Sequence, residues 1–184
     1  MTQKSITLRA MEPEDLDELY EIENDRGLWD VGTTNVPYSR YALHQYIAST
    51  NNDIFADRQL RLIIQTEDGR LAGIIDLYNY EPLHNRAEVG VVIKAEYRNQ
   101  GMAKAALDEL HRYAADVLDI YQLYAVVAAT NDHSLHLFKS QGYEATATLR
   151  HWLHEKGGYQ DAVLLQKKTL PLHPQSEEGI RLVR

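Results

Sequence analysis

The sequence predicts an α/β (α+β) fold in which helices flank a mixed central sheet. Segments with the two-residue period of strands and segments with the 3.6-residue period of helices follow one another along the chain. The length of 184 residues suits one ordinary domain, and 44% apolar and 25% charged residues are typical of a globular protein. Because no internal repeat or second domain is visible, residues 1–170 form the predicted domain and residues 171–184 a tail without periodicity.

The first part of the domain is predicted as a strand followed by two helices. Residues 6–8 alternate apolar and polar side chains, as a short strand does. Pro13 opens the first helix, and acidic residues follow in its first turn, where negative charge suits the helix dipole. After a polar stretch from Asp25 to Tyr38, Ser39 is the expected N-cap of the second helix.

Three strands and the longest helix come next. Residues 60–65 and 71–80 are joined by the turn Asp68-Gly69, which predicts a hairpin. Residues 86–93 form the next predicted strand. Apolar residues at helical spacing between residues 103 and 117 predict the helix that follows it.

The last part is predicted as a strand, a short helix and two strands. Residues 120–129 are rich in Val, Ala and Tyr, as a strand is. Thr130 or Asn131 caps a helix that ends at Gly142, a residue suited to the position after a helix. The two final strands, joined by a turn at Gly157-Gly158, are residues 143–154 and 159–166.

The segment Arg98-Asn99-Gln100-Gly101-Met102-Ala103 connects a strand to a helix. A helix that starts after such a loop presents free N–H groups at its positive end, which suits a phosphate or pyrophosphate. Gly101 lets the backbone approach that ligand, and Ala103 keeps the helix start slim. A purely structural turn explains the glycine equally well. Neither the P-loop pattern nor the dinucleotide pattern Gly-x-Gly-x-x-Gly occurs in the chain.

Four motifs together resemble the GNAT N-acetyltransferase family, in the branch of the ribosomal-protein N-terminal acetyltransferases and the bacterial spermidine N-acetyltransferases. The loop is similar to the Arg/Gln-x-x-Gly-x-Gly/Ala pattern of the family's acetyl-CoA site, and the order of strands and helices is that of the family. The other motifs are Leu8-Arg9-Ala10-x-x-Pro13-x-Asp15, Asn131-x-x-Ser134-x-x-Leu137-Phe138-x-x-x-Gly142-Tyr143 and Gly158-Tyr159-Gln160-Asp161.

The resemblance implies a GNAT fold and an enzyme that transfers the acetyl group of acetyl-CoA to a primary amine, for example a polyamine such as spermidine. The alternatives are N-terminal acetylation of a protein, as in the ribosomal-protein enzymes, and a weakly active sensor that binds acyl-CoA. Relatives form dimers and larger rings, which implies a homo-oligomer. Because the chain has no cysteine to carry the acetyl group, direct transfer is expected.

The resemblance also implies where acetyl-CoA binds. In the family, the central strand separates from its neighbour, pantetheine lies in the gap, and strand N–H groups polarise the thioester carbonyl. The loop and the helix start hold the pyrophosphate, and the late helix contacts the pantetheine arm. The implied cofactor-binding residues are Val91, Val92, Ile93, Arg98, Asn99, Gln100, Gly101, Met102, Ala103, Lys104, Asn131, Ser134 and Phe138.

Glu88 is the candidate general base. It lies on the central strand, where the family has a carboxylate near the acceptor amine, and an amine must lose a proton before it attacks. The alternative is a solvent-facing Glu88 paired with Arg86. Aromatic side chains that would give the acceptor pocket its walls are Trp29, Tyr38, Tyr78, Tyr80 and Tyr97.

Phe138 is the second implied catalytic position, and it departs from the family pattern. Most relatives have a tyrosine there that donates a proton to the CoA sulfur, whereas Phe138 has no proton to give. Three alternatives follow. The proton comes from water or from a hydroxyl of Ser134, Ser140 or Tyr143; the thiolate leaves without a proton donor; or the protein is a weak enzyme. Packing in the core is the alternative role of Phe138, and an N-cap is a second, compatible role of Asn131.

Composition argues against several other classes of function. The net charge of −8, from 27 acidic and 19 basic residues, disfavours nucleic acid as a partner and mildly favours cationic ligands. No apolar run suits a membrane span and the N-terminus lacks a secretory signal, so a cytoplasmic protein is expected. No metal site is expected: a strand places His151 and His154 on opposite faces, and His133 and His136 lack a nearby acidic ligand.

Overall fold

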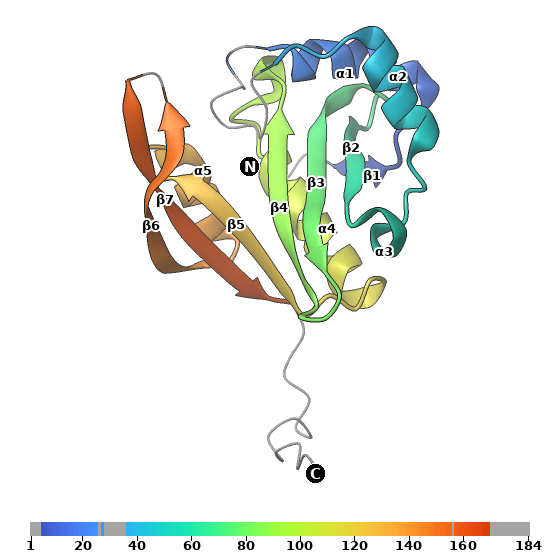
Figure 1. The fold of residues 1–184 in the computed structure, drawn as a ribbon. Coiled ribbons are helices and arrows are strands. Elements are labelled where there is room, and N and C mark those ends of the chain that lie inside the picture. Colours follow the sequence, from blue (N-terminus) through green and yellow to red (C-terminus); the bar gives the residue numbers. More distant parts are fainter. Residues whose placement is uncertain (1–4, 26, 28–35, 156, 170–184) are drawn as a thin grey trace.

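The computed structural model describes residues 5–25, 27, 36–155 and 157–169, and the predicted tail 171–184 lies outside them. Within this part of the chain the predicted α/β architecture is confirmed, with a seven-stranded sheet in the order β1-β2-β3-β4-β5-β7-β6 (Figure 1). The strands are β1 (Ile6–Arg9), β2 (Leu60–Thr66), β3 (Leu71–Glu81), β4 (Arg86–Ile93), β5 (Gln122–Ala128), β6 (Glu144–Glu155) and β7 (Gly158–Lys168). The helices are η1 (Pro13–Asp15), α1 (Leu16–Glu23), α2 (Arg40–Ser49), α3 (Ile54–Asp57), η2 (Ala95–Tyr97), α4 (Met102–Asp116) and α5 (Asp132–Ser140).

Side-chain caps start two helices where the sequence predicts them. Ser39 Oγ accepts a hydrogen bond from the N–H of Ala42 at 3.0 Å, and Asn131 Oδ1 accepts one from the N–H of Ser134 at 3.0 Å. The helix predicted from Pro13 begins instead with the 3₁₀ turn η1, so that α1 starts three residues later. The short α3 is not predicted, because four residues are too few to show a helical period.

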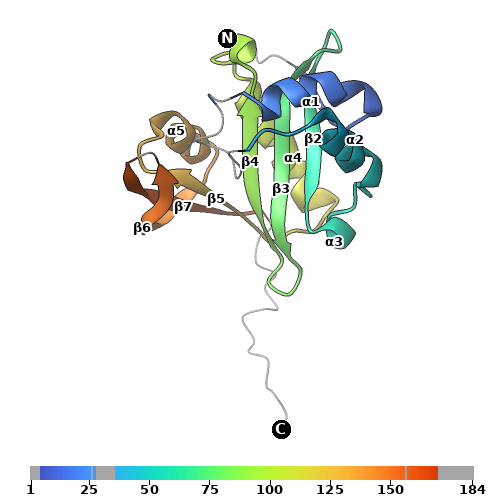
Figure 2. The same ribbon diagram turned by 45° about the horizontal axis from the view of Figure 1, so that its top comes forward.

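Helices cover both faces of the sheet (Figures 1 and 2). α1 and α2 pack on one face, where Leu19 and Ile47 meet Ile74 of β3. α4 and α5 pack on the opposite face, and their Leu107 and Phe138 belong to the larger of the two apolar cores. Burial on both faces fixes which side chains of each strand point to α1 and α2 and which to α4, because strand side chains alternate.

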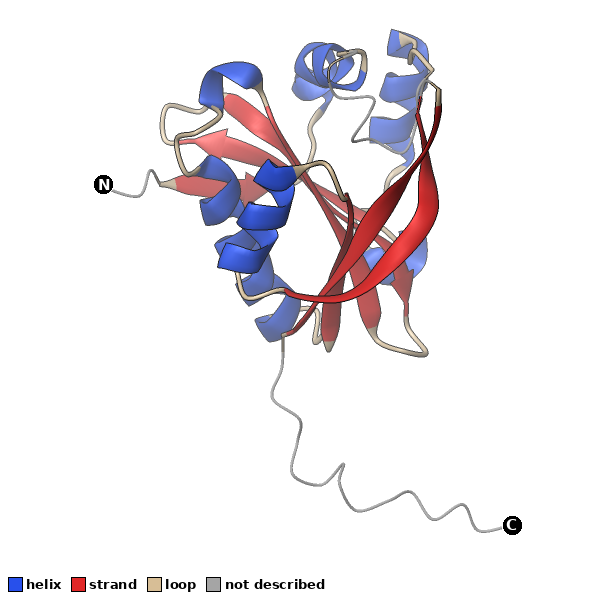
Figure 3. Cartoon of the chain, turned by 90° about the vertical axis from the view of Figure 1, so that its left-hand side faces the viewer, coloured by secondary structure: helices blue, strands red, loops and turns tan. Residues whose placement is uncertain are grey.

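The parallel strands β4 and β5 diverge along their length. Residues 86–88 of β4 pair with residues 122–124 of β5, and the register stops there. Beyond this point β4 continues beside β3 and β5 continues beside β7, so the two halves of the sheet separate (Figures 1 and 2). The long β6–β7 hairpin forms the outer side of the second half (Figure 3). The predicted separation of the central strand from its neighbour is therefore confirmed.

Candidate active site

The edge of β4 that faces away from β3 presents backbone N–H groups toward the separation. Lys94 donates its N–H to the carbonyl of Ala72 in β3, at 2.9 Å. Because alternate residues of a strand point their N–H groups to the same side, the N–H of Val92 also faces β3. Those of Val91 and Ile93 face the side of β5. Of the predicted residues Val91, Val92 and Ile93, the first and the last are thus placed to donate backbone N–H groups into the gap between β4 and β5. The side chain of Val92 packs with α1 and α2.

The loop between β4 and α4 leaves the positive end of α4 without a cap. Positive φ values at Asn99 (58°) and Gly101 (80°) turn the chain into the helix. Arg98 Nε donates to the last carbonyl of β4 at 3.0 Å, and Gln100 Nε2 donates to a carbonyl of η2 at 2.6 Å, so side chains brace the loop from both sides. No side chain caps the first turn of α4, and that turn has no acidic residue.

This helix start fits an anionic group such as a pyrophosphate. Uncapped N–H groups and the helix dipole attract negative charge, and a Cβ added at Gly101 would meet no atom within 4 Å, so the space in front of the loop is open. The exposed Arg98 and Lys104 add positive charge on either side. Met102 is 3% exposed and belongs to the core, so its contribution is through its backbone.

Glu88 lies at the last position where β4 pairs with β5, on the face of the sheet covered by α1 and α2. It is 9% exposed, and two neutral groups of β3 hold its carboxylate: the hydroxyl of Tyr78 donates to Oε1 at 3.1 Å, and the amide of Asn79 donates to Oε2 at 3.0 Å. The alternative of a solvent-facing Glu88 paired with Arg86 is wrong. Arg86 pairs with Glu81 instead, at 2.7 Å.

A second phenol approaches the same carboxylate from β5. Tyr124 is the register partner of Glu88. Burial and the Glu88 carboxylate raise the pKa of Tyr78 and the pKa of Tyr124, so both phenols are neutral donors near pH 7. The sequence does not single out Tyr124, because its approach depends on the register of a parallel pair. For Asn79 a signal exists, since an asparagine inside an apolar strand favours a bulge.

A partly buried ionic cluster lies beside Glu88 on the same face and is not apparent from the sequence. Arg61 of β2 binds Asp76 of β3 through two hydrogen bonds of 2.8 and 2.9 Å, and it also pairs with Glu23 at the end of α1. Its guanidinium carbon lies 5.6 Å from the ring centroid of Tyr46 on α2. Burial opposes its charge, but Asp76 and Glu23 outweigh burial and raise the pKa of Arg61. Arg61 therefore neutralises both acids and ties α1 and α2 to the sheet.

Phe138 packs in the core. It is 4% exposed, and its ring meets the ring of Tyr143 edge to face, with centroids 5.0 Å apart. Two of the hydroxyls considered as replacement acids already have partners: Tyr143 Oη lies 3.1 Å from His111 Nε2, and Ser140 Oγ donates to the carbonyl of Leu137 at 2.7 Å. Core packing of Phe138 is thus confirmed, and its contact with the cofactor stays a prediction.

The hydroxyl of Tyr143 belongs to a half-buried network between α4 and β7. Lys167 Nζ lies 3.0 Å from His111 Nδ1 and donates to the carbonyl of Gln141 at 2.7 Å. Because an ammonium only donates, Nδ1 of His111 is the acceptor, and Nε2–H donates to Tyr143. Burial lowers the pKa of His111 to about 4, the Lys167 cation acts in the same direction, and Asp108 opposes them.

The free energy of unfolding is expected to fall on acidification because of His111. Its pKa is 6.5 in an unfolded chain and about 4 here, so between these values the unfolded state binds the additional proton. The contribution is complete above pH 6.5 and is lost toward pH 4, by about 2 kcal/mol between pH 7 and pH 5. Urea unfolding at both pH values measures it. His111→Gln should remove this part of the pH dependence and the exposed His133→Gln should not; an unchanged dependence in His111→Gln contradicts the assignment.

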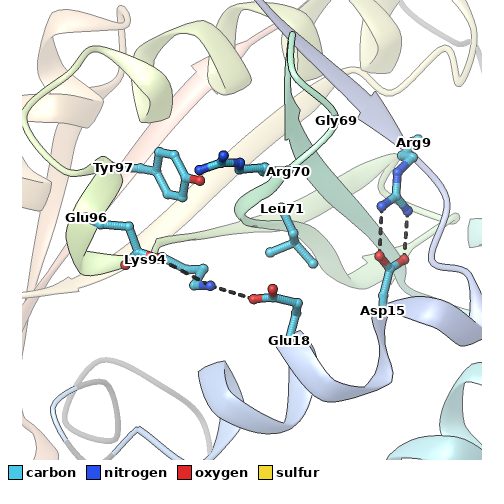
Figure 4. Close-up of a pocket in the computed structure, with 9 residues that line it drawn as sticks. All are labelled: Arg9, Asp15, Glu18, Gly69, Arg70, Leu71, Lys94, Glu96 and Tyr97. Atoms are coloured by element: carbon cyan, nitrogen blue, oxygen red, sulfur yellow. Dashed lines mark hydrogen bonds and ion pairs between the residues drawn. The ribbon is translucent and has the colours of Figure 1, made fainter.

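A cavity of about 370 Å³ lies between α1, the tip of the β2–β3 hairpin and the chain after β4 (Figure 4). It is lined by Arg9, Asp15, Glu18, Gly69, Arg70, Leu71, Lys94, Glu96 and Tyr97. Arg9 binds Asp15 through two hydrogen bonds of 2.7 Å, and Lys94 pairs with both Glu18 and Glu96. These ion pairs engage five of the nine lining residues, and Glu88 is not part of the lining. The cavity is therefore not where we place the reaction.

The aromatic residues predicted as pocket walls lie in different places. Tyr78 contacts Glu88, whereas Tyr80 is 7% exposed and packs in the core. Tyr97 lines the cavity of Figure 4, and Tyr38 is bonded through its backbone to the end of α1. Trp29 lies outside the described residues. Of the predicted wall residues, Tyr78 is thus the one that contacts the candidate base Glu88.

The residues that the structure describes contain no group of three or more His, Asp or Glu side chains arranged to hold a metal ion. None of their helices combines the length and the apolar composition needed to cross a membrane.

Comparison with known proteins agrees with the sequence and the geometry. Residues 5–144 match the acetyltransferase (GNAT) domain family. The chain is 26% identical over 159 residues to spermidine N(1)-acetyltransferase of Escherichia coli K12, covering 86% of this chain and 83% of that one. It is 28% identical over 162 residues to a putative ribosomal N-acetyltransferase of Bacillus subtilis, covering 86% and 88%. The structure of spermidine N-acetyltransferase from Vibrio cholerae with CoA and spermine shares its fold, with a TM-score of 0.80, 24% identity and coverage of 92% and 97%.

The chain belongs to the GNAT acetyltransferase family. It is an acetyl-CoA-dependent N-acetyltransferase, and the GNAT fold that the motifs imply is confirmed.

Proposed function

We propose that this enzyme acetylates a polyamine such as spermidine, with Glu88 as the general base. The observation that carries the proposal is the setting of Glu88, a buried carboxylate at the point where β4 and β5 separate, held by uncharged donors. Such a carboxylate attracts an ammonium group and is able to take its proton. Two spermidine N(1)-acetyltransferases, from Escherichia coli and Vibrio cholerae, match this chain over at least 83% of their length and support a polyamine as acceptor.

The residues divide the work of acetyl transfer between them. Acetyl-CoA supplies the acetyl group as a thioester, and residues 98–104 bind its pyrophosphate. The N–H groups of Val91 and Ile93 donate to the carbonyl oxygen where negative charge develops. Asn131 and Ser134 at the start of α5 bind the pantetheine arm. These assignments rest on the uncapped start of α4 and the free edge of β4.

Proton transfer is assigned to Glu88. It accepts a proton from the acceptor ammonium, directly or through one water, so that the neutral amine attacks the acetyl carbon. The new C–N bond forms as the C–S bond breaks. The nitrogen of the adduct loses its second proton to water as the amide forms, and the thiolate takes up a proton from water, because Phe138 offers none. Glu88 passes its own proton to solvent, which restores the carboxylate.

A steady-state assay with acetyl-CoA and a panel of acceptors tests the acceptor class. The panel contains spermidine, spermine, a monoamine of similar length and a peptide with the N-terminus of a ribosomal protein. We expect kcat/KM for a polyamine to exceed that for the monoamine and the peptide by at least about tenfold, because a second ammonium meets the negative charge of the protein. A preference for the monoamine would contradict the assignment of a polyamine as the acceptor. If no acceptor raises the rate of CoA release above the rate without enzyme, the protein acts as a sensor that binds acyl-CoA.

N-terminal acetylation of a protein is the second candidate. It is favoured by the 28% identity with a putative ribosomal N-acetyltransferase, which covers 86% of this chain. A preference for the peptide in the same assay supports it. We also infer a homo-oligomer, supported by the shared fold with a dodecameric spermidine N-acetyltransferase from Vibrio cholerae at a TM-score of 0.76. Light scattering after gel filtration tests the assembly.

Phe138→Tyr is expected to raise kcat by about tenfold, which corresponds to about 1.4 kcal/mol of transition-state stabilisation. The added hydroxyl would supply the proton that the thiolate otherwise takes from water. Measuring kcat and the melting temperature on the same sample checks it. A flat rate with about 1–3 kcal/mol of lost stability would mean that the hydroxyl is buried without a partner and that Phe138 serves the core alone. Tyr143→Phe, which removes the neighbouring hydroxyl from His111, should lower stability and leave kcat unchanged.

A further inference from the structure

Two consecutive residues of β3 donate to one carboxylate, which regular strand geometry forbids. Side chains of successive strand residues point to opposite faces, yet Tyr78 and Asn79 bind Oε1 and Oε2 of Glu88 at 3.1 and 3.0 Å. The register of β3 against β4 shifts between Tyr78 and Glu81, and Asn79 adopts a left-handed conformation with φ of 51°. This bulge turns Asn79 back to the face of Tyr78. Bulges that re-aim a side chain are typical of functional sites.

Gly90 provides the space for the Tyr78 ring. It stands two residues after Glu88 on the same face of β4. A Cβ added at Gly90 would lie 3.0 Å from Cε1 of Tyr78 and 3.8 Å from its hydroxyl oxygen. Any larger residue would therefore require the Tyr78 ring to shift by a few tenths of an ångström. A glycine inside an otherwise apolar strand weakens it, and here the missing side chain has this specific use.

In the part of the chain that the structure describes, two arginines of the strands around Glu88 are engaged with other acids. Arg86 pairs with Glu81, and Arg61 pairs with Asp76 and Glu23. The hydrogen bonds that satisfy the buried carboxylate therefore come from uncharged groups. A guanidinium in their place would compete with the substrate ammonium for the carboxylate, whereas a phenol and an amide orient it without neutralising it.

We propose that Tyr78 and Asn79 are positioning residues of the acetyl-transfer reaction, and that Gly90 leaves the space that the Tyr78 ring occupies. Together they hold the Glu88 carboxylate in one orientation where β4 and β5 separate. The inference rests on the proposed role of Glu88 as the base, and it adds the β3 bulge and Gly90 to the machinery that acts through this residue.

The pH dependence of kcat/KM tests the two donors. Tyr78→Phe keeps the ring and removes the hydroxyl, and Asn79→Gly keeps the left-handed backbone and removes the amide. Each variant loses a hydrogen bond to the carboxylate, so the acidic limb of the kcat/KM profile should move to higher pH. The plateau should fall by about tenfold as Glu88 loses its orientation. The KM for acetyl-CoA should stay unchanged.

Matched controls separate this effect from a general loss of structure. Tyr113→Phe removes a phenol hydroxyl from α4, on the opposite face of the sheet. Asn52→Gly changes an exposed asparagine with nearly the same φ, 52°. Neither control should move the acidic limb. The inference is overturned if the acidic limb moves as far in the controls as in Tyr78→Phe and Asn79→Gly. It is also overturned if the limb moves in neither of these two variants.

A double-mutant cycle tests whether Gly90 acts by leaving space for the Tyr78 ring. Gly90→Ala should lower kcat/KM by about tenfold when Tyr78 is present, because the methyl group displaces the ring. In a Tyr78→Val background the same change should lower it by less than about twofold, since no ring remains to displace. Equal effects in both backgrounds overturn the role of Gly90.

Glu88→Gln distinguishes a failure of this inference from a failure of the proposed base. If Glu88→Gln removes both the rate and the acidic limb while Tyr78→Phe and Asn79→Gly leave the limb in place, the positioning role is wrong and the base stands. If Glu88→Gln keeps the rate and the limb, the base is wrong and the positioning role falls with it.

Discussion

Replacing Glu88 by Gln is expected to lower kcat by about 10²-fold or more without weakening acetyl-CoA binding. Gln has the shape of Glu and no basicity, so the acceptor ammonium loses the group that takes its proton. The change leaves the helix start at residues 101–104 and the free edge of β4 untouched. Steady-state rates at saturating polyamine measure the first effect, and calorimetric titration with acetyl-CoA measures the second.

The surroundings of Glu88 allow this substitution without a misfolded site. Asn79 continues to donate to the amide oxygen, and the Tyr78 hydroxyl turns to accept from the new NH₂ group, so no buried polar atom loses its partner. Glu81→Gln is the matched control, because it makes the same chemical change at a half-exposed acid that pairs with Arg86. It should keep the wild-type rate. Wild-type kcat in Glu88→Gln between about pH 6 and pH 9 would remove Glu88 from the mechanism.

The architecture is predictable because local signals and the fold agree. Ser39 and Asn131 are strong caps and both start a helix, and the predicted strand 86–93 has the bounds of β4. Departures occur where a segment is too short for a period, as in α3, or where one turn takes a different hydrogen-bond pattern, as at Pro13. These departures do not change the topology.

The site is predictable only in part, because its contacts depend on register. The sequence places Glu88 on the central strand, but whether it faces solvent or the interior depends on the position of α1 and α2. The contact of Tyr124 depends on the register of a parallel pair, which no local pattern specifies. The contact of Asn79 depends on a bulge, and the asparagine within the strand is its local signal. The loop at Gly101 is different. Its backbone geometry follows from the residues themselves, since a glycine with positive φ suits the start of α4.

Gly101→Val is expected to abolish detectable acetyl-CoA binding while the domain stays folded. The position of a Cβ at Gly101 is open, with no atom within 4 Å, so the new side chain would occupy the space where we place the pyrophosphate. A valine at φ of 80° is also strained, which should lower the free energy of unfolding by about 1–2 kcal/mol. Gly101→Ala, with a smaller side chain, should weaken binding by about tenfold or more.

Gly69→Val separates the strain from the loss of the binding site. Gly69 has φ of 81° and equally open surroundings, and it lies at the tip of the β2–β3 hairpin. Both valine variants should therefore lose similar stability, measured by thermal unfolding without ligand. Only Gly101→Val should lose the rise in melting temperature that saturating acetyl-CoA gives the wild type. If folded Gly101→Val binds acetyl-CoA with unchanged affinity by calorimetry, the pyrophosphate is not held at this loop, and the uncapped start of α4 is only a turn between a strand and a helix.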